Sequence, residues 1–479
     1  MQEQIKYRQM RNSLLFILSG LIILSSCIKD EGNYDYNYLG TVTVQNMPER
    51  ESIVNVKQGE TLQFIPRIET DIPIDEFSYV WYFERWEGRD TISLERNLKV
   101  LADFDGGRLY FEIKHDKSNV RWLNQIYVDV LLPYQLGWAV LTTEGTKTYF
   151  NFFEQNSLFN YTYFLKLYTE INGESLAPDG EEVRYFDKDE SWIVRSASAF
   201  SLINTEGITL RNSSSKMFVE PLEEPVSIPY MGFNNSEGGF RYRTLVANKK
   251  LYAVPYVNSV NISSDYMFDR PAEGDYELDH QVASIGTKQV LGFDHKYRRY
   301  VTFIIRTGII NAVVPTIDNN SLAFDPGNLN KDCIWMMNKQ FGTADGRIPV
   351  FSILKDDTDN YQLQIFTALD SKITLQKEVD IPSSVINENT SISFDNVSGD
   401  IYFYDSNQVH LYNSANNTFT ENWKTFESKV LAITKEDDLM AVATQAGNNS
   451  RFRVFKGDKL ELISELVAGE IVSMGLKNR

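Results

Sequence analysis

The feature that most constrains this chain of 479 residues is its regular alternation of short β-prone runs with turn-forming residues. Gly, Asn, Asp and Ser interrupt the apolar and aromatic runs about every eight to fifteen residues, a spacing typical of strands joined by hairpins. Aromatic residues make up 13% of the chain, with 26 Tyr and 29 Phe, and such side chains favour strands. The pattern predicts an all-β fold, and the length predicts more than one domain.

The N-terminus has the features of a signal peptide. A basic segment that ends at Arg11 precedes the apolar run Leu14–Leu24, which is shorter than the roughly 20 residues needed to span a membrane. The next residues, Leu24-Ser25-Ser26-Cys27, resemble the lipobox of bacterial lipoproteins, in which the chain is cut before the cysteine and the cysteine is acylated. The resemblance implies a signal peptide over residues 1–26 and a lipid on Cys27. The alternative is an ordinary secretory signal with an incidental cysteine.

Residues 27–39 are polar and are predicted to form a lipidated tether. Within this segment, Lys29, Asp30 and Glu31 resemble the Lys-plus-acidic signal of Bacteroidetes lipoproteins that are moved to the cell surface. The resemblance implies a protein anchored by its lipid in the outer membrane and facing the cell exterior.

The charge balance excludes one class of partner. The chain has 65 acidic and 47 basic residues and a formal net charge of −18, so it lacks the positive face that nucleic acid or an anionic lipid surface requires. Acylation of Cys27 would leave Cys333 as the remaining cysteine, which excludes an internal disulfide. Cys333 lies in an apolar run and is predicted to be a core residue.

Residues 40–133 contain a first series of short strands. After the turn at Gly59, Leu62 and Phe64 fall on one face of a strand, while Thr61 and Gln63 fall on the other. Further β-prone runs follow without a convincing helix, and Pro133 ends the last of them. Five to seven such strands in about ninety residues predict a β-sandwich.

Four sequence features in this region resemble the PKD-like family of Bacteroidetes lipoproteins. They are the segment Gly32–Tyr36 after the cysteine, the strand Tyr79–Trp81, the segment Asp90–Ser93 after a hairpin, and Gly137–Leu141 at the start of the next domain. The resemblance covers roughly residues 27–145 and implies an N-terminal PKD-like domain. It also implies a part in nutrient uptake beside a TonB-dependent importer and its capture lipoprotein. It supplies no catalytic residues.

Residues 134–479 form a longer array of strands. Phe293-Asp294 and Phe394-Asp395 each precede a polar turn and an aromatic strand, and similar hairpins follow toward the C-terminus. Such repeated hairpins are typical of a β-propeller, and the length would make seven or eight blades of about 40 to 45 residues each. Two or three further sandwich domains are the alternative. The segment from Glu170 to Glu190 is predicted to be a long loop.

No catalytic motif is recognisable in the chain. The four histidines, His115, His280, His295 and His410, are far apart in sequence, and no Gly-x-Ser-x-Gly, Walker or dinucleotide motif occurs. A glycosidase needs only two carboxylates about 5 to 9.5 Å apart, so a carboxylate-dependent polysaccharide-degrading enzyme on a propeller stays open as an alternative.

Two acidic loops and two tryptophans are the remaining site candidates. Asp187 and Asp189, and likewise Asp357 and Asp359, space their carboxylates as in a calcium loop, although both loops lack the glycine and distal Glu of an EF-hand. Trp86 and Trp192 lie in polar surroundings that suit contact with a sugar or peptide; the alternative is that each packs on a neighbouring strand, since Trp is usually mostly buried.

The sequence therefore predicts an all-β lipoprotein with an Ig/PKD-like sandwich and a seven- or eight-bladed propeller-like domain. The predicted function is non-catalytic binding of a glycan or peptide as an accessory to a TonB-dependent uptake system. No cofactor is expected, except a calcium ion at one of the two acidic loops. The third alternative, besides the enzyme, is a purely structural subunit of an importer complex.

Overall fold

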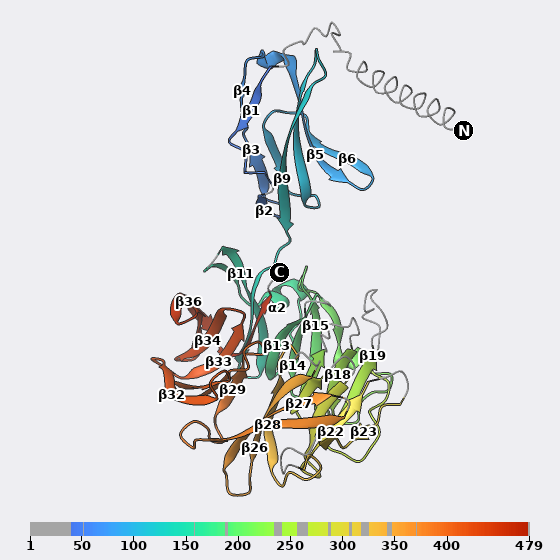
Figure 1. Ribbon diagram of the computed structural model, residues 1–479, viewed down its shortest axis with the longest axis vertical. Coiled ribbons are helices and arrows are strands. Elements are labelled where there is room, and N and C mark those ends of the chain that lie inside the picture. Colours follow the sequence, from blue (N-terminus) through green and yellow to red (C-terminus); the bar gives the residue numbers. More distant parts are fainter. Residues whose placement is uncertain are drawn as a thin grey trace, which may run out of the picture. The chain divides into compact units, whose positions relative to one another are not determined.

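The computed structural model describes residues 40–50, 52–157, 159–186, 190–233, 242–255, 267–285, 289–305, 309–317, 325–342, 347–369 and 371–477. These residues form strands with very little helix, so the predicted all-β class is confirmed. The chain divides into two compact units between Leu131 and Leu132 (Figure 1). No helix within the described ranges is long and apolar enough to cross a membrane.

The first unit contains one five-stranded sheet and two strand pairs. The sheet has the order β2 (Ile53–Lys57), β9 (Arg121–Leu131), β8 (Gly107–His115), β5 (Phe77–Arg85) and β6 (Gly88–Ser93). The pairs are β1 (Val42–Gln45) with β4 (Arg67–Thr70), and β3 (Thr61–Phe64) with β7 (Leu98–Leu101), and a 3-10 turn η1 (Ile74–Glu76) precedes β5. Strand β2 runs parallel to β9, and the other pairings are antiparallel.

One apolar core joins these strands into a sandwich. Trp81 on β5 stacks on Phe111 of β8 with ring centroids 4.3 Å apart, and Phe64 of β3 also stacks with Trp81 at 5.8 Å. The Trp81 indole donates a hydrogen bond to the carbonyl oxygen of Glu95 at 2.9 Å, so its polar atom is satisfied inside the core. Leu62 and Phe64 are buried and Thr61 and Gln63 exposed, as the alternation in the sequence predicts.

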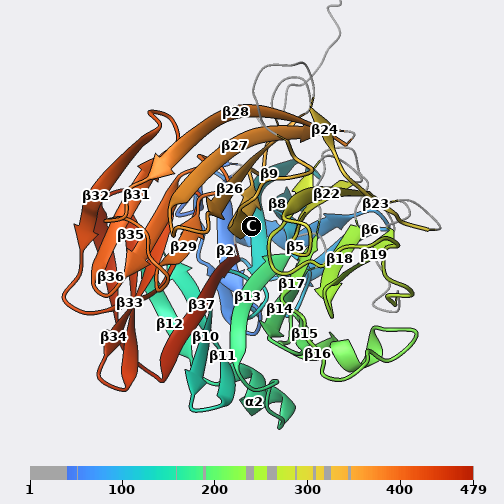
Figure 2. The same ribbon diagram turned by 90° about the horizontal axis from the view of Figure 1, so that it is seen from below.

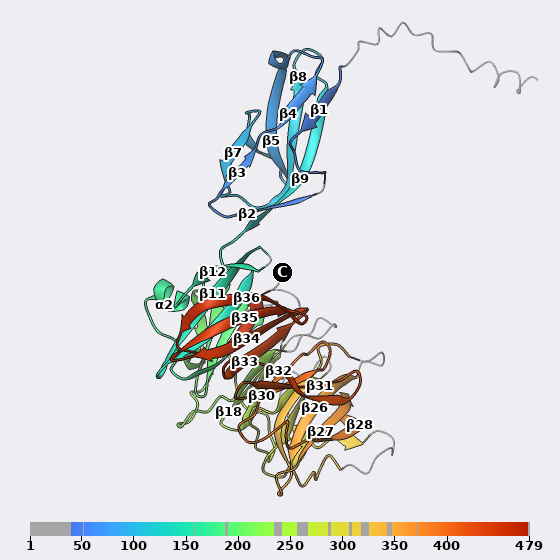
Figure 3. The ribbon, with the colours of Figure 1, turned by 90° about the vertical axis from the view of Figure 1, so that its left-hand side faces the viewer.

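The described residues of the second unit form seven sheets of consecutive antiparallel strands (Figures 2 and 3). The first sheet contains β10 (Gly137–Glu144), β11 (Lys147–Ser157), β12 (Asn160–Phe164) and β37 (Glu470–Lys477). The second contains β13 (Gly180–Phe186), β14 (Ser191–Ser196), β15 (Phe200–Asn204) and β16 (Leu210–Ser213). The third contains β17 (Tyr230–Phe233), β18 (Tyr242–Ala247) and β19 (Lys250–Pro255). Helix α2 (Leu167–Asn172) precedes the second sheet, and a 3-10 turn η2 (Ser214–Lys216) follows it.

The remaining four sheets follow the same pattern. The fourth contains β20 (Val282–Ile285), β21 (Gln289–Asp294), β22 (Arg299–Ile304) and β23 (Ala312–Val313). The fifth contains β25 (Asp332–Asn338), β26 (Ile348–Lys355), β27 (Tyr361–Leu369) and β28 (Lys372–Ile381), with the short β24 (Thr316–Ile317) parallel to β28. The sixth contains β29 (Ser391–Phe394), β30 (Ile401–Asp405), β31 (Gln408–Asn413) and β32 (Thr418–Thr425). The seventh contains β33 (Val430–Glu436), β34 (Leu439–Ala446), β35 (Asn449–Lys456) and β36 (Lys459–Ala468).

The first sheet combines strands from both ends of the second unit. Strand β37 pairs antiparallel with β10 from Gly137 opposite Lys477 to Thr143 opposite Glu470. One edge of this sheet is therefore formed by the last strand of the chain, and β10, β11 and β12 follow it in that order. In each of the seven sheets, one edge strand occupies the place that β37 occupies in the first sheet. We call these edge strands the first strands of their sheets, whatever their order in the chain: β37, β13, β17, β20, β25, β29 and β33.

Seven apolar clusters connect each sheet of this unit to the next. Trp192 of the second sheet lies 5.9 Å from Phe150 of the first, and Tyr300 of the fourth lies 5.1 Å from Phe366 of the fifth. The last sheet contacts the first in the same way, through Phe452 and Trp138 at 5.7 Å. The succession of sheet-to-sheet contacts therefore returns to the sheet from which it began.

The predicted long loop between Glu170 and Glu190 is wrong. Part of α2 and the whole of β13 lie within this segment. Val183 on β13 is buried against the first sheet, whereas Glu182 and Arg184 carry charges that pair with each other. These charges give the segment the composition of a loop, although its backbone is a strand.

We expect residues 134–479 to remain soluble when expressed alone, and residues 150–479 to aggregate. The shorter fragment lacks β10, and with it Trp138 and Val140, which are fully buried in the cluster between the last and first sheets. Without β10, the strand β37 has no neighbour to pair with. Size-exclusion chromatography and circular dichroism would measure both fragments. A soluble, cooperatively melting 150–479 fragment would contradict this role of β10.

Candidate functional site

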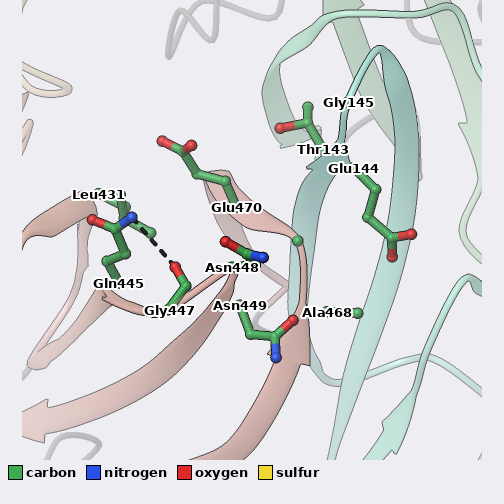
Figure 4. A pocket seen from close by; sticks show the side chains of 11 residues that line it. Thr143, Glu144, Gly145, Leu431, Gln445, Gly447, Asn448, Asn449, Ala468 and Glu470 are labelled. Carbon is green, nitrogen blue, oxygen red and sulfur yellow. Dashed lines mark hydrogen bonds between the residues drawn. The ribbon is translucent and has the colours of Figure 1, made fainter.

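A pocket of about 660 Å³ opens between the first and last sheets of the second unit (Figure 4). Three connections form its walls: the β10–β11 turn, the β34–β35 turn and the link from β36 to β37. The pocket is lined by Thr143, Glu144, Gly145, Leu431, Gln445, Gly447, Asn448, Asn449, Ala468, Gly469 and Glu470. It therefore lies where the two ends of the second unit meet.

Glycines bring these connections close together. Gly145, Gly447 and Gly469 have φ angles of +64°, +65° and +79°, in the left-handed region that favours glycine. At Gly469 an added Cβ atom would lie 2.4 Å from the carbonyl oxygen of Thr143, so a side chain there would collide with the β10–β11 hairpin. At Gly447 an added Cβ would meet nothing within 4 Å. Gly469 is thus required for the close approach of the β36–β37 link to the first sheet.

The chemical character of the pocket is polar and without positive charge. Its side chains include three amides, one hydroxyl and two carboxylates, and its lining contains no Lys, Arg or aromatic residue. The amide of Gln445 donates a hydrogen bond to the carbonyl oxygen of Gly447 at 3.4 Å, and Glu144 pairs with Lys166 at 3.0 Å. Asn448, Asn449 and Glu470 make no side-chain hydrogen bond or ion pair with the other described residues, so these groups are available to a ligand.

A second polar feature is an ionic network on β13 and β14. One carboxylate oxygen of Glu182 accepts a hydrogen bond from Nε of the buried Arg195 at 3.1 Å, and the other pairs with Arg184. Arg195 also pairs with Glu181 at 2.5 Å. Burial alone would raise the pKa of Glu182, but the two guanidinium groups outweigh it and hold that pKa below its usual value. Glu182 is therefore a fixed anion that orients both arginines.

Glu436, at the end of the first strand β33, has the opposite behaviour. Burial raises the pKa of this carboxyl to about 7, and the negative charges of Asp437 and Asp395 act in the same direction. Arg184 and Lys435 oppose this shift without cancelling it. Glu436 thus changes its charge near neutral pH.

Two of the four histidines lie close together through an intervening glutamine. The amide of Gln281 is 3.1 Å from Nε2 of His280, and its oxygen is 2.8 Å from Nε2 of His295. Burial lowers the pKa of His280, but the hydrogen bond with Asp279 outweighs it and raises that pKa. The other two histidines are apart from this pair: His115 contacts Glu76, and His410 accepts a hydrogen bond from the backbone of Asn422.

The acidic loop at Asp357 and Asp359 does not form a calcium cage. Asp357 pairs with Arg298 at 2.9 Å, and Asp359 pairs with Lys355 at 2.7 Å, so the two carboxylates bind different cations of the protein. Asp356 closes the loop instead by accepting hydrogen bonds from Thr358 and Asn360. Across the described ranges, no group of three or more His, Cys, Asp or Glu side chains could hold a metal ion.

Several predicted site residues lie outside the described residues. They are Cys27, Lys29, Asp30, Glu31, Asp187 and Asp189. Cys333 lies within them and is buried between the fourth and fifth sheets, as predicted. Its thiol is 3.2 Å from the Ser352 hydroxyl, and burial raises its pKa to about 12, so it is not a reactive thiolate.

Comparison with known proteins identifies the N-terminal part of the chain. Residues 27–179 match the model of the PKD-like family. The N-terminal unit is therefore a PKD-like domain. The match continues beyond that domain into the first sheet of the second unit. A search of curated protein sequences finds no match.

Similar solved structures have low sequence identity. A quinonprotein alcohol dehydrogenase-like protein from Bacteroides thetaiotaomicron is 13% identical, with 92% of this chain and 100% of that chain covered and a TM-score of 0.42. A functionally unknown protein from Desulfotomaculum acetoxidans is 14% identical, with 71% and 98% covered and a TM-score of 0.41. Sqt1 from Saccharomyces cerevisiae is 8% identical, with 71% and 87% covered and a TM-score of 0.39. At these scores the likenesses carry no functional argument.

The two tryptophans proposed as ligand contacts have opposite environments. Trp86, in the β5–β6 hairpin of the PKD-like domain, is fully exposed, so its ring is available for contact. Trp192 is fully buried between the first and second sheets, where Phe150, Phe152 and Tyr185 surround it. The prediction that Trp192 contacts a ligand is therefore wrong, because β14 turns this side chain into the core.

The pocket and the ionic network were not identified from the sequence. Gly447-Asn448-Asn449 has the composition of any hairpin turn, and nothing in its local pattern indicates that it faces the β10–β11 hairpin. Likewise, the sequence gives no sign that Glu182 and Arg195 form an ion pair, because the pairing of β13 with β14 brings them together. The sequence features that could have indicated the pocket are the turn glycines Gly145 and Gly447 and the linking Gly469, and these residues lie far apart in the chain.

We predict that Glu436→Gln stabilises the protein at pH 8 more than at pH 5. The folded protein keeps the Glu436 proton up to about pH 7, whereas the unfolded chain loses it near pH 4.5. The folded state therefore binds more protons between these values, and stability falls as pH rises through this window. An uncharged Gln removes the cost of the buried charge, by about 1 to 3 kcal/mol at pH 8 once partial exposure to solvent is allowed for.

Urea unfolding followed by tryptophan fluorescence would measure this difference. The control is Glu421→Gln, which neutralises an exposed carboxylate on β32. An equal change at both pH values, or a loss of stability at pH 8, would contradict the assigned environment of Glu436.

Proposed function

We propose that the chain is a lipid-anchored outer-membrane lipoprotein that binds a ligand without transforming it, as an accessory to a TonB-dependent nutrient uptake system. The observation that carries the proposal is that the PKD-like match begins at Cys27, the residue predicted to be acylated. A mature chain that starts at this cysteine would carry its lipid directly before the PKD-like domain. Surface display and association with an importer and its capture lipoprotein rest on the tether sequence and on the PKD-like resemblance.

In this proposal the second unit is a seven-bladed β-propeller. Two observations support this architecture: the seven shared apolar clusters that lead from the last sheet back to the first, and the pairing of β37 with β10. Five pairs of first strands from neighbouring sheets also contact each other, as strands around a common axis would: β37 with β13, β17 with β20, β20 with β25, β29 with β33, and β33 with β37. Blades of this kind present their turns on two faces, where ligands can bind without disturbing the cores.

The binding role is supported by the polar pocket between the first and last sheets. Its free amides and carboxylate lie at a turn and at the starts of two strands, and buried apolar side chains hold those strands in place. A rigid scaffold that presents unpaired polar groups is suited to reversible capture.

Replacement of Cys27 by alanine tests the anchor. We expect Cys27→Ala to abolish acylation, so that the protein accumulates as uncleaved precursor or is released from the outer membrane. Membrane fractionation and metabolic labelling with a fatty-acid analogue would detect both effects. Cys333→Ala is the matched control, because that thiol is buried in the second unit. Normal processing and membrane retention of Cys27→Ala would remove the lipoprotein assignment.

Protease treatment of intact cells tests surface display. The wild-type protein should be degraded, whereas a variant with Lys29, Asp30 and Glu31 all changed to alanine should be protected, because it would remain on the inner side of the membrane. A periplasmic protein serves as the control for cell integrity. Equal protection of both forms would place the protein in the periplasm.

A further inference from the structure

We propose that the pocket between the first and last sheets is a binding site for an uncharged carbohydrate, held by the amides of Gln445, Asn448 and Asn449. This assignment deepens the proposed binding function by naming the site and the class of ligand, and it rests on that function for its biological meaning.

The hydrogen-bonding groups of the pocket match those of sugar hydroxyls. A side-chain amide offers two donors and an acceptor, and a carboxylate offers acceptors, while each hydroxyl of a sugar both donates and accepts. Figure 4 shows Asn448 and Asn449 on one wall and Glu144 on the opposite β10–β11 hairpin. A ring-shaped ligand with hydroxyls around its edge could therefore bond to the asparagine amides while it lies against the β10–β11 hairpin.

The charge of the pocket selects against anions. Glu144 and Glu470 belong to the lining and no cationic side chain does, within a chain of net charge −18. An acidic sugar or a phosphate would meet the carboxylate of Glu470, which no described cation neutralises, and would find no cationic side chain in the lining, which costs free energy in a partly enclosed site. Lys166, which precedes α2 and pairs with Glu144 at 3.0 Å, is not part of the lining.

The lining also disfavours an ordinary peptide. Peptides are commonly held by an open strand edge or by apolar pockets for alternate side chains. Here the apolar side chains of the lining are Leu431 and Ala468, and the walls are turns rather than a free strand edge. A carbohydrate needs neither feature, because its hydroxyls supply the bonds.

Binding at this position should also stabilise the second unit. The pocket walls belong to the first sheet, the last sheet and the link into β37, so a bound ligand connects the segments that bring the two ends of the unit together. A ligand that binds the folded state alone raises the melting temperature with increasing concentration. Sugar binding is therefore measurable as a thermal shift as well as by calorimetry.

The test uses the detergent-solubilised mature protein and named probes. These are neutral hexasaccharides of glucose, xylose and mannose, the anionic hexasaccharide of galacturonic acid, and hexa-alanine. We expect at least one neutral hexasaccharide to bind by isothermal titration calorimetry and to raise the melting temperature, and the galacturonate and the peptide to do neither. The double variant Asn448→Ala, Asn449→Ala should weaken the sugar at least about tenfold, since each lost amide removes hydrogen bonds.

Asn416→Ala is the matched control, because it removes an exposed asparagine from the β31–β32 turn of the sixth sheet. Gln445→Ala provides a second pocket variant, and melting of each variant without sugar establishes that it is folded. Failure of all three neutral probes to bind would overturn the proposal, as would sugar binding that the pocket variants leave unchanged. Binding of hexa-alanine through the same amides would overturn the choice of ligand. A protein that binds sugar but does not reach the outer membrane would contradict the proposed function and leave this site intact.

Discussion

The antiparallel pairing of β37 with β10 places the last strand of the chain inside the first sheet of the second unit. Its register runs from Gly137 opposite Lys477 to Thr143 opposite Glu470, so residues more than three hundred positions apart in the chain share backbone hydrogen bonds. The apolar cluster between the last and first sheets is assembled by the same pairing, since Trp138 and Phe452 meet there. The candidate pocket depends on it as well, because Gly469 and Glu470 lie at the point where β37 begins.

The distribution of side chains follows from this arrangement. Each sheet buries aromatic and branched residues against the next. Glu182 is held as an anion by Arg184 and Arg195, whereas burial keeps Glu436 protonated up to about neutral pH. The structure thus contains both an ionic network whose charges are fixed and a carboxyl group that titrates near neutral pH. The unpaired amides of Asn448 and Asn449 in the pocket form a third, uncharged group.

Local sequence patterns predicted the strands well, but could not predict which other segments each strand packs against. Trp86 and Trp192 both follow polar segments, and yet one is fully exposed in a hairpin and the other is buried between two sheets.

The two Phe-Asp motifs, Phe293-Asp294 and Phe394-Asp395, show the same limit of local sequence patterns. Asp294 and Asp395 each accept a hydrogen bond from the backbone two residues ahead, which closes a turn. However, the first turn joins the second and third strands of its sheet and the second joins the first and second. The motif therefore marks a hairpin rather than a position in the repeat.

The sequence by itself determined the all-β class, the strand faces of the PKD-like domain and the burial of Cys333, because these follow from side-chain alternation and from local apolar runs. The tertiary structure alone decided which strands become neighbours. It made β13 a strand paired with β14, where charged residues had indicated a loop, and it brought Asn448 close to the first sheet. The physical reason is the distance along the chain over which each kind of interaction acts. Alternation and turn chemistry act over a few residues, whereas the pocket and the ionic network arise from pairings and packing between segments that are distant in the chain.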